Sequence, residues 1–462
     1  MKKFLGQYLL VSVAIFTLLI STAQAGYQIR KGRIFNDATQ AVQLRGVNWF
    51  GFETPDHVVH GLWAREWKSM ITQMKSLGFN AVRLPFCPAT VQGSSVATVN
   101  YSLNPDLQNK NSLEVLDLVV NRFNSEQMHV LLDHHRPDCN AISELWYTGS
   151  YSETQWISDL TFVANRYKNL PYFLGLDLKN EPHGSATWGT GNNATDWNRA
   201  AERAAAQILA NAPNILIFVE GVGENPVCSD GTFGHFWGEN IQPLACAPLS
   251  IPANRLVLSP HVYGPDVFDM LYFQVQNFPA NMPAIWNQHF GRFQNDGYAL
   301  VIGEFGGKFG HGGNPRDVTW QNAFVDYLTG KNIRDSFYWS WNPNSGDTGG
   351  ILKDDWTNVW QDKVDLLNRL WKVAPGAGRD SIYGRVTTNP GRGISGARVT
   401  MTDLSGNARY ATTNQSGVHH FTDAATGTTY TLAAARKRFR FDAARSLNIS
   451  EETNNLNFIA RP

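Results

Sequence analysis

From Gly175 to His183 the chain reads Gly-Leu-Asp-Leu-Lys-Asn-Glu-Pro-His. Leucines at positions 174, 176 and 178 alternate with less apolar residues, which is the period of an extended strand. Pro182 cannot continue a sheet ladder, so we expect the strand to end at Glu181. Parallel α/β barrels carry their functional groups at such C-terminal strand tips.

A second stretch of the same kind runs from Ala299 to Gly307 and reads Ala-Leu-Val-Ile-Gly-Glu-Phe-Gly-Gly. It is again an apolar run that ends in one glutamate, Glu304. Two strand-end glutamates suggest a site built on two carboxylates. The alternative is that each glutamate only caps the loop or helix that follows, because a short motif on its own is weak support.

The remaining pattern extends these two strands into a repeating unit. Eight segments are predicted as strands, namely 42–49, 79–84, 128–133, 173–179, 215–219, 255–261, 299–303 and 336–341. Six segments have helical periodicity, namely 63–76, 112–127, 153–167, 194–210, 317–328 and 355–371. Strands that alternate with helices favour a parallel sheet, and eight such units favour a (β/α)8 TIM barrel over 26–373 rather than a doubly wound sheet.

Composition and the N-terminus indicate an exported globular protein. The 462 residues are 43% hydrophobic and 17% charged, and the formal net charge is zero. This balance gives no electrostatic reason to expect nucleic acid, a membrane surface or a charged substrate as partner. Residues 1–25 have a basic start, an apolar run from Leu9 to Ile20 and a small-residue cleavage pattern, which predict a signal peptide. The run is short for a membrane anchor, the alternative, so we expect secretion of a chain that begins at Gly26.

Four cysteines in an exported chain are expected to be oxidised, and three pairings are formally possible. Cys87 and Cys139 each follow one of two adjacent predicted strands, so we expect them to pair. Cys228 and Cys246 would then close one loop. A zinc site is the weaker alternative, because neither pair has Cys-x-x-Cys spacing or a nearby histidine.

Other predicted strand ends carry residues of matching chemistry. They are Arg83, His135, His261, Tyr263 and Trp341. Taken singly, each has an ordinary structural explanation such as a surface ion pair, a buried histidine or core packing. A barrel, however, brings all its strand ends to one mouth, so we expect them to form one site with the two glutamates.

The ordered set of motifs over 27–373 resembles glycoside hydrolase family 5, the cellulases, and within it bacterial endo-β-1,4-glucanases. The motifs that carry the resemblance are Leu-Arg-Gly-Val-Asn-Trp at 44–49, Arg-Leu-Pro at 83–85, Asp-His-His-Arg-Pro-Asp at 133–138, Asn-Glu-Pro at 180–182, His-Val-Tyr at 261–263, Gly-Glu-Phe-Gly at 303–306 and the run from Trp339 to Lys353. The resemblance implies a secreted enzyme that cleaves internal bonds of cellulose or a related β-glucan with retention of configuration.

The same resemblance implies roles for individual residues. Glu181 becomes the general acid/base and Glu304 the nucleophile, whose charge Arg83 would stabilise. Asn180 becomes the donor to the sugar 2-hydroxyl. The expected substrate-binding residues around them are His135, His261, Tyr263, Trp341, Trp49, Trp237 and Lys353. Trp341 is expected to form the floor under the cleaved sugar, with a cis peptide bond to Asn342, and His134 is expected to be structural.

We expect no metal and no cofactor, a β-1,4-glucan polysaccharide or oligosaccharide as the partner, and a monomer. The alternative activities on the same barrel fold are those of a β-mannanase or a xyloglucanase. A non-catalytic glycan-binding protein is disfavoured, because both glutamates are kept.

The sequence pattern changes from alternating strands and helices to short strands alone after a short linker at 374–378. Six short strand patterns follow in 379–462 and predict a small all-β sandwich domain, which loosely resembles carboxypeptidase-regulatory-like, transthyretin-type sandwiches. This tail has no tryptophan, so we do not expect a cellulose-binding module. From Gly376 onward it carries eleven Arg and Lys against six Asp and Glu. We interpret that excess as a solvated face, with contact to an anionic cell envelope as the alternative.

Overall fold

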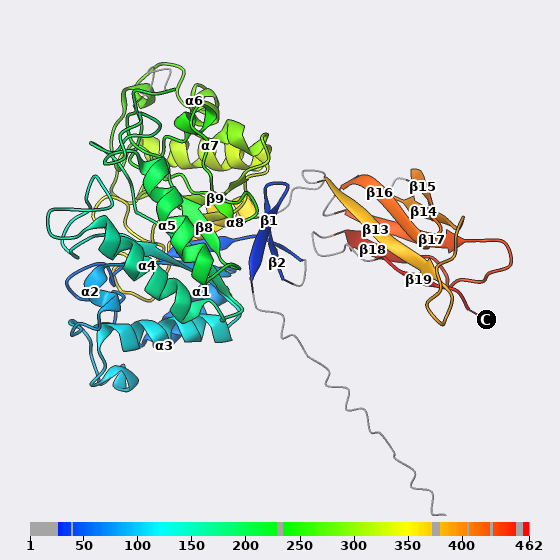
Figure 1. Ribbon diagram of the computed structural model, residues 1–462, viewed down its shortest axis with the longest axis horizontal. Helices are drawn as coiled ribbons and strands as arrows, with labels where there is room; N and C mark the ends of the chain where they lie inside the picture. The colour runs from blue at the N-terminus through cyan, green and yellow to red at the C-terminus, as the bar shows by residue number, and fades with distance from the viewer. Residues whose placement is uncertain are drawn as a thin grey trace, which may run out of the picture.

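The computed structural model describes residues 26–37, 40–228, 234–371, 379–403, 406–425, 428–449 and 456–461 (Figure 1). The predicted signal peptide and the predicted linker at 374–378 lie outside these residues. No helix in the described ranges is long and apolar enough to cross a membrane.

A parallel sheet of nine strand segments forms the larger unit. The segments are β4 (Arg45–Asn48), β5 (Ala81–Phe86), β6 (His129–His134), β7 (Phe173–Asp177), β8 (Leu216–Val219), β9 (Leu256–Leu258), β10 (Ala299–Leu300), β11 (Ile302–Phe305) and β12 (Ser336–Tyr338). Neighbours along the chain pair in parallel from β4 to β10. β10 and β11 are two pieces of one barrel strand, interrupted at Val301. Because β11 pairs with β12 and β12 pairs with β4, the sheet closes into the predicted eight-stranded barrel.

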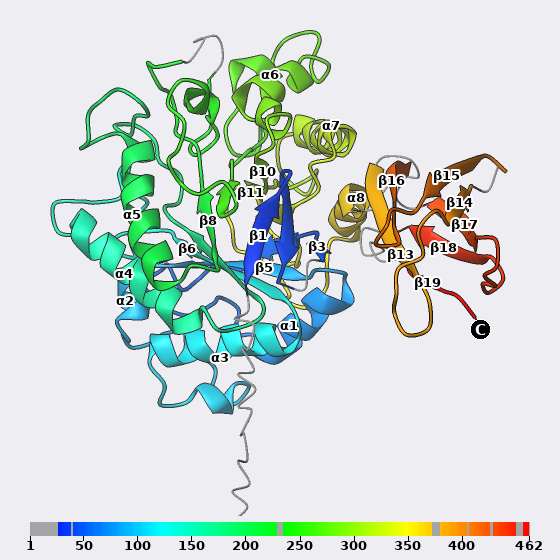
Figure 2. The ribbon, with the colours of Figure 1, turned by 45° about the vertical axis from the view of Figure 1, so that its right-hand side comes forward.

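Helices surround this barrel (Figures 1 and 2). They are α1 (Trp67–Ser76), α2 (Pro88–Val91), α3 (Ser112–Ser125), α4 (Glu153–Tyr167), α5 (Trp197–Asn211), α6 (Met282–His289), α7 (Arg316–Lys331) and α8 (Gln361–Trp371), with 3-10 turns η1 (Pro105–Leu107), η2 (Gln242–Ala245), η3 (Leu271–Phe273) and η4 (Gly291–Gln294). α1 begins later than predicted, because the Glu66 side chain caps it by accepting a hydrogen bond from the Ser69 N–H. α6 was not predicted.

A small antiparallel sheet closes the N-terminal end of the barrel. It consists of β1 (Tyr27–Arg30), β2 (Arg33–Asn36) and β3 (Ala41–Val42). The Tyr27 and Ile29 N–H groups donate to the carbonyls of Asn214 and Asn254, which precede β8 and β9. Apolar side chains of this hairpin join those inside the barrel in one buried cluster. The opposite end of the barrel, where the strands terminate, is therefore the end left for a site.

Residues 379–461 form a second unit with its own core. Its strands are β13 (Arg379–Thr387), β14 (Arg398–Thr402), β15 (Ala408–Thr412), β16 (Val418–Ala425), β17 (Thr428–Ala435), β18 (Arg445–Ile449) and β19 (Phe458–Ile459). They form a sheet of order β16-β13-β19 and a sheet of order β15-β14-β17-β18, with one hydrophobic cluster drawn from both. This is the arrangement of the predicted sandwich. β18 was not predicted, and the likeness to transthyretin-type domains stays a prediction.

Candidate functional site

A cleft of about 720 Å³ lies at the C-terminal end of the barrel strands. Glu181 and Glu304 both line it, and so do His135, Asn180 and Tyr263. These five residues, which were predicted to meet at the mouth of the barrel, therefore line one cleft. The barrel topology brings them together from positions up to 169 residues apart in the sequence.

Arg83 lies on β5 beneath the cleft and is completely buried. Its Nη1 donates to Oε1 of Glu304 at 2.5 Å and to the Asn48 side chain at 3.1 Å. Its Nε donates to Asp177 at 3.0 Å, and Nη2 lies 3.0 Å from a carboxylate oxygen of Asp133. The predicted contact between Arg83 and Glu304 is thus present, and the same guanidinium also organises two acids that the sequence analysis did not single out.

Glu304 lies on β11 and is held from two sides. Besides the Arg83 contact at Oε1, its Oε2 accepts a hydrogen bond of 2.6 Å from the Tyr263 hydroxyl. Burial raises the pKa of Glu304, while the charge of Arg83 and the Tyr263 hydrogen bond oppose the rise. Both contacts favour the ionised carboxylate and fix its orientation.

Glu181 follows β7 and is held mainly through its backbone. Its φ of 52° is in the left-handed region, which a non-glycine residue rarely adopts. Its N–H donates to Oε2 of Glu220 at 2.8 Å. Burial, and next the negative charge of Glu304, raise the pKa of Glu181 well above its usual range. Glu181 therefore keeps its proton more readily than an exposed glutamate.

His261 joins the two glutamates. Its Nδ1 lies 3.2 Å from Oε1 of Glu181 and 3.4 Å from Oε2 of Glu304, and one oxygen of each carboxylate and this nitrogen all lie within 4.8 Å of one another. Its Nε2 lies 3.1 Å from Glu220. Burial, and next the charge of Arg83, lower the pKa of His261 well below its usual range, so the ring is neutral.

The residues missed from sequence form the layer directly below. Glu220 follows β8, Asp133 lies on β6 and Asp177 ends β7, and all three are fully buried. Burial raises the pKa of Asp133 to about 6 and that of Asp177 to about 7, although Arg83 opposes both shifts. Lys179 is also buried, and burial lowers its pKa to about 8. The available signal was an ionisable residue in or just after an otherwise apolar strand.

The two adjacent histidines have the different surroundings that were predicted. His135 lines the cleft, and its Nδ1 lies 2.6 Å from Oδ2 of Asp133. His134 is instead buried, with its Nε2 3.1 Å from the Tyr151 hydroxyl and its ring stacked on that tyrosine. His134 therefore supports the barrel wall.

The predicted floor, Trp341, is in the wrong place. Its side chain is completely buried and packs edge-on against Phe79, away from the cleft. β12 ends at Tyr338, so the residue at the strand tip is Trp339, which lines the cleft and lies parallel to the rings of His135 and Phe50. The non-proline cis bond is likewise at Trp339–Ser340 and not after Trp341.

Two further aromatic and cationic predictions also need correction. Trp49 is fully buried and donates from its indole nitrogen to the His60 carbonyl, so it is a core residue. Lys353 does not line the cleft, and its ammonium lies over the Trp360 ring at 4.5 Å. Trp237, by contrast, is half-exposed, lines the cleft and stacks on His183.

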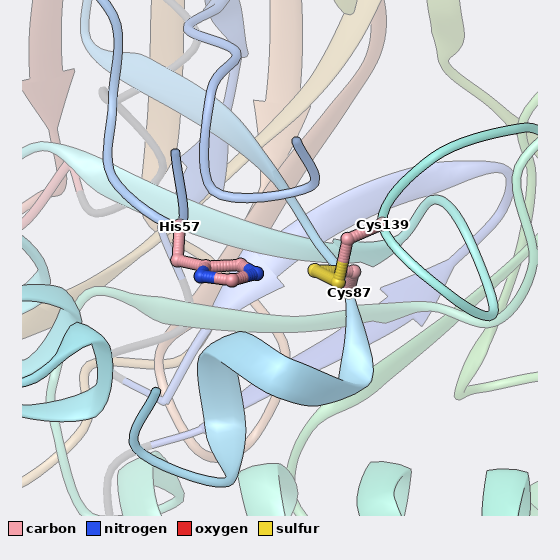
Figure 3. A group of neighbouring side chains, drawn as sticks. All are labelled: His57, Cys87 and Cys139. Carbon is pink, nitrogen blue, oxygen red and sulfur yellow. A yellow bond between two sulfur atoms is a disulfide. The ribbon is translucent and has the colours of Figure 1, made fainter. Parts of the chain in front are cut away.

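The cysteines pair as predicted, Cys87 with Cys139 and Cys228 with Cys246. Figure 3 shows the first disulfide at the start of α2, with His57 beside it. Because both sulfurs are oxidised, these three residues do not form a thiolate metal site. Among the described residues, the other groups with metal-ligand spacing are Asp177, Glu220 and His261, and Glu181, His261 and Glu304. Arg83 contacts members of both and already supplies the positive charge that a cation would bring.

Comparisons with known proteins agree with this geometry. The chain is 64% identical over 367 residues to the major extracellular endoglucanase of Xanthomonas campestris pv. campestris, a span of 78% of this chain and 75% of that protein. The solved catalytic domain of the major endoglucanase from that organism superposes with a TM-score of 0.73 at 65% identity, covering 75% of this chain and 99% of that one. A Pyrococcus horikoshii endocellulase solved in complex with cellotetraose has a TM-score of 0.74 at 47% identity, covering 76% of this chain and all of that one. Residues 36–345 match the family described as cellulase, glycosyl hydrolase family 5, and the chain belongs to that family.

Proposed function

We propose that the protein is a secreted endo-β-1,4-glucanase in which Glu181 is the general acid/base and Glu304 the nucleophile of a retaining double displacement. The single observation that carries the assignment is that both carboxylates contact His261 Nδ1, with one oxygen of each within 4.8 Å of the other, and that their surroundings are unequal. Retaining glycosidases hold their two carboxyl groups about 5–5.5 Å apart, whereas inverting ones leave about 6.5–9.5 Å for a water. The close spacing supports retention.

In the first step Glu304 attacks the anomeric carbon while Glu181 protonates the leaving glycosidic oxygen. Arg83 and Tyr263 stabilise the ionised form of Glu304 and aim its free lone pairs at the substrate. Within the described part of the chain no cation contacts Glu181 directly, and burial together with the nearby charge of Glu304 keeps it protonated. The negative charge of Glu304 therefore makes Glu304 nucleophilic and also keeps Glu181 protonated.

In the second step Glu181 removes a proton from the water that hydrolyses the glycosyl-enzyme. Once Glu304 is esterified, its negative charge no longer raises the pKa of Glu181. Glu181 then becomes a stronger acid and releases its proton more readily, as a residue that changes from acid to base requires.

The substrate is held by groups around the two carboxyls. The Asn180 side chain accepts from Arg83 through its oxygen, and its Nδ2 is buried without a hydrogen-bond partner in the described structure. That amide is the donor we assign to the sugar 2-hydroxyl. His135 and Trp339 form an aromatic wall beside it, and Trp237 offers a half-exposed ring farther along the cleft.

Export follows from the predicted signal peptide at 1–25, and the extracellular relative supports it. We propose that the mature chain from Gly26 works as a monomer on a β-1,4-glucan polysaccharide or oligosaccharide. Nucleic acid and membrane are not expected as partners of the barrel.

The test combines the stereochemistry of the first products with the activity of two variants. Proton NMR of the earliest products from a cello-oligosaccharide should show the β-anomer before mutarotation. Glu304→Ala should abolish hydrolysis of every substrate. Glu181→Ala should still form the covalent intermediate from an aryl cellobioside with an activated leaving group, which needs no acid. Early appearance of the α-anomer, or full activity of Glu304→Ala, would refute the assignment.

A further inference from the structure

The family match covers residues 36–345 and does not reach the second unit, one end of which has an unusual surface. Between β17 and β18 the chain reads Arg-Lys-Arg-Phe-Arg-Phe from Arg436 to Phe441. Arg436 and Phe439 pair as a tight antiparallel turn, and Arg438 has a φ of 74°. We call Arg436–Phe441 the basic turn.

The charges of the basic turn are available to a ligand. Lys437, Arg438 and Arg440 are exposed, and within the described residues their side chains have no hydrogen-bond or ion-pair partner. The adjacent acid, Asp442, is already paired with Arg461, whose backbone N–H donates to the Arg440 carbonyl. Among the described residues, therefore, no acid pairs with these three outer cations.

A shallow depression of about 440 Å³ lies beside these cations. The Phe439 and Phe441 rings line it together with Arg436 and Lys437. Arg436 is fixed there, because its Nη1 donates to the Gly396 carbonyl at 2.8 Å. Aromatic faces beside guanidinium and ammonium groups suit a ring-shaped anionic ligand, because the rings pack on its apolar face while the cations bind its acidic groups.

The sign of the charge sets this surface apart from the barrel. Residues 26–375 carry 33 acidic against 26 basic residues, whereas the tail has the opposite balance. A polyanion would therefore be repelled by the barrel as a whole and attracted to the basic turn. At the tip the side chains are those of Lys437 and Arg438 rather than Phe439, which disfavours insertion into a lipid layer, since that needs apolar residues at the tip.

We propose that the basic turn binds an anionic polysaccharide, a chain of sugars that carry carboxylate or sulfate groups, and so holds the enzyme near charged glycans that its barrel does not cleave. The site is separate from the catalytic cleft and does not depend on the roles given to Glu181 and Glu304.

The test uses the full mature chain and polygalacturonate and dextran sulfate as the two probes, with neutral dextran as the uncharged control. Affinity electrophoresis or calorimetry at low salt should show binding to one or both anionic chains, none to dextran, and loss of binding at high salt as the charges are screened. Binding to polygalacturonate identifies carboxylates as the ligand groups, and binding to dextran sulfate alone identifies sulfates. Equal retention by dextran would overturn the proposal.

Two triple variants separate the basic turn from net charge. Lys437→Gln, Arg438→Asn and Arg440→Gln remove three charges from the turn, and Asn tolerates the left-handed backbone at position 438. Because exposed charge contacts are each worth a few-fold in binding, together they should weaken binding about tenfold. The matched control, Arg385→Gln, Arg392→Gln and Arg409→Gln, removes three exposed charges elsewhere on the unit and should change binding less than twofold.

Activity on soluble β-glucan and the melting temperature should stay the same in both variants, which checks that each one folds. Equal loss in the two variants would show a net-charge effect and refute a site at the turn. Tighter binding to anionic phospholipid vesicles or to duplex DNA than to either polysaccharide would refute the ligand class.

Discussion

Glu220 provides the sharpest test of how this site is held. Its carboxylate accepts from the Glu181 N–H at Oε2, and its Oε1 faces Arg83 Nη2 at 3.4 Å and His261 Nε2 at 3.1 Å. Each oxygen thus meets a group that can donate. We predict that Glu220 is a positioning residue, which fixes the left-handed backbone of Glu181 and so the aim of its carboxyl group.

Glu220→Gln keeps the shape but leaves only one accepting oxygen. The amide nitrogen must then face either the Glu181 N–H or the Arg83 side, and a buried donor loses its acceptor. An unsatisfied buried polar group costs about 1–3 kcal/mol. If the lost hydrogen bond misplaces the Glu181 carboxyl group, the same free energy is added to the activation barrier. In that case kcat/KM on cello-oligosaccharides should drop roughly tenfold to a hundredfold, with little change in KM.

The choice of substrate separates positioning from general damage. An aryl cellobioside with an activated leaving group needs no acid, so formation of its covalent intermediate should be almost unaffected in Glu220→Gln. Arg83→Lys is the matched control. It disturbs Glu304 as well, so both substrates should suffer.

A second variant approaches Glu220 from the other side. A Cβ on Gly238 would lie 2.3 Å from Oε2 of Glu220, and Gly238 has a φ of 74°. Gly238→Ala should therefore reproduce the selective defect of Glu220→Gln. Equal losses on the two substrates, or a kcat/KM within twofold of the wild type on cello-oligosaccharides, would show that Glu220 does not act through Glu181.

Three further predictions follow from the site and its support. Trp339→Ala should lower kcat/KM with little loss of stability. Trp341→Ala should instead lower the free energy of unfolding by about 3–5 kcal/mol, as urea titration would show. A purely catalytic effect of Trp341→Ala would contradict its place in the core. Replacing Cys87 and Cys139 with serine should cost roughly 4 kcal/mol by the loop-entropy relation for 52 residues, and an unchanged urea midpoint would refute it. The pKa of Asp177, about 7 against an ordinary 3.8, means that the folded state binds the extra proton, so stability should fall as pH rises from about 4 to 7, and Asp177→Asn should flatten that part of the calorimetric profile.

Sequence patterns located the barrel because its strands are apolar runs with polar tips. They were less reliable where loops decide geometry. α6 begins with a proline at its second position inside a long loop, so its pattern was missed. β12 ends three residues before the predicted strand end at Trp341, and that offset moved the cleft-wall role from Trp339 to Trp341. No local rule fixes where a short buried strand ends, because burial on both faces removes the alternation that would show it.

The acids beneath the cleft could have been found by asking which charges the strands themselves must bury. β5, β6 and β7 are fully buried, yet each carries one Arg or Asp side chain, namely Arg83, Asp133 and Asp177. Burying any one of them alone would be costly, so a cation on one strand implies anions on its neighbours. The register meets that demand, because Asp133 pairs directly with Asp177 and both reach Arg83.

Glu304 and Glu220 also contact this guanidinium, so Arg83 meets more negative charge than it can neutralise. Asp177, whose pKa burial raises to about 7, therefore holds a proton part of the time at neutral pH. The excess of acid around a single arginine is therefore what keeps a proton available at the base of the cleft, next to Glu181. Removing one structural acid, as in Asp177→Asn, should lower the pKa of the remaining acids and move the alkaline limb of the kcat/KM profile to lower pH; an unmoved limb would show that Asp177 is electrostatically isolated from the two catalytic groups.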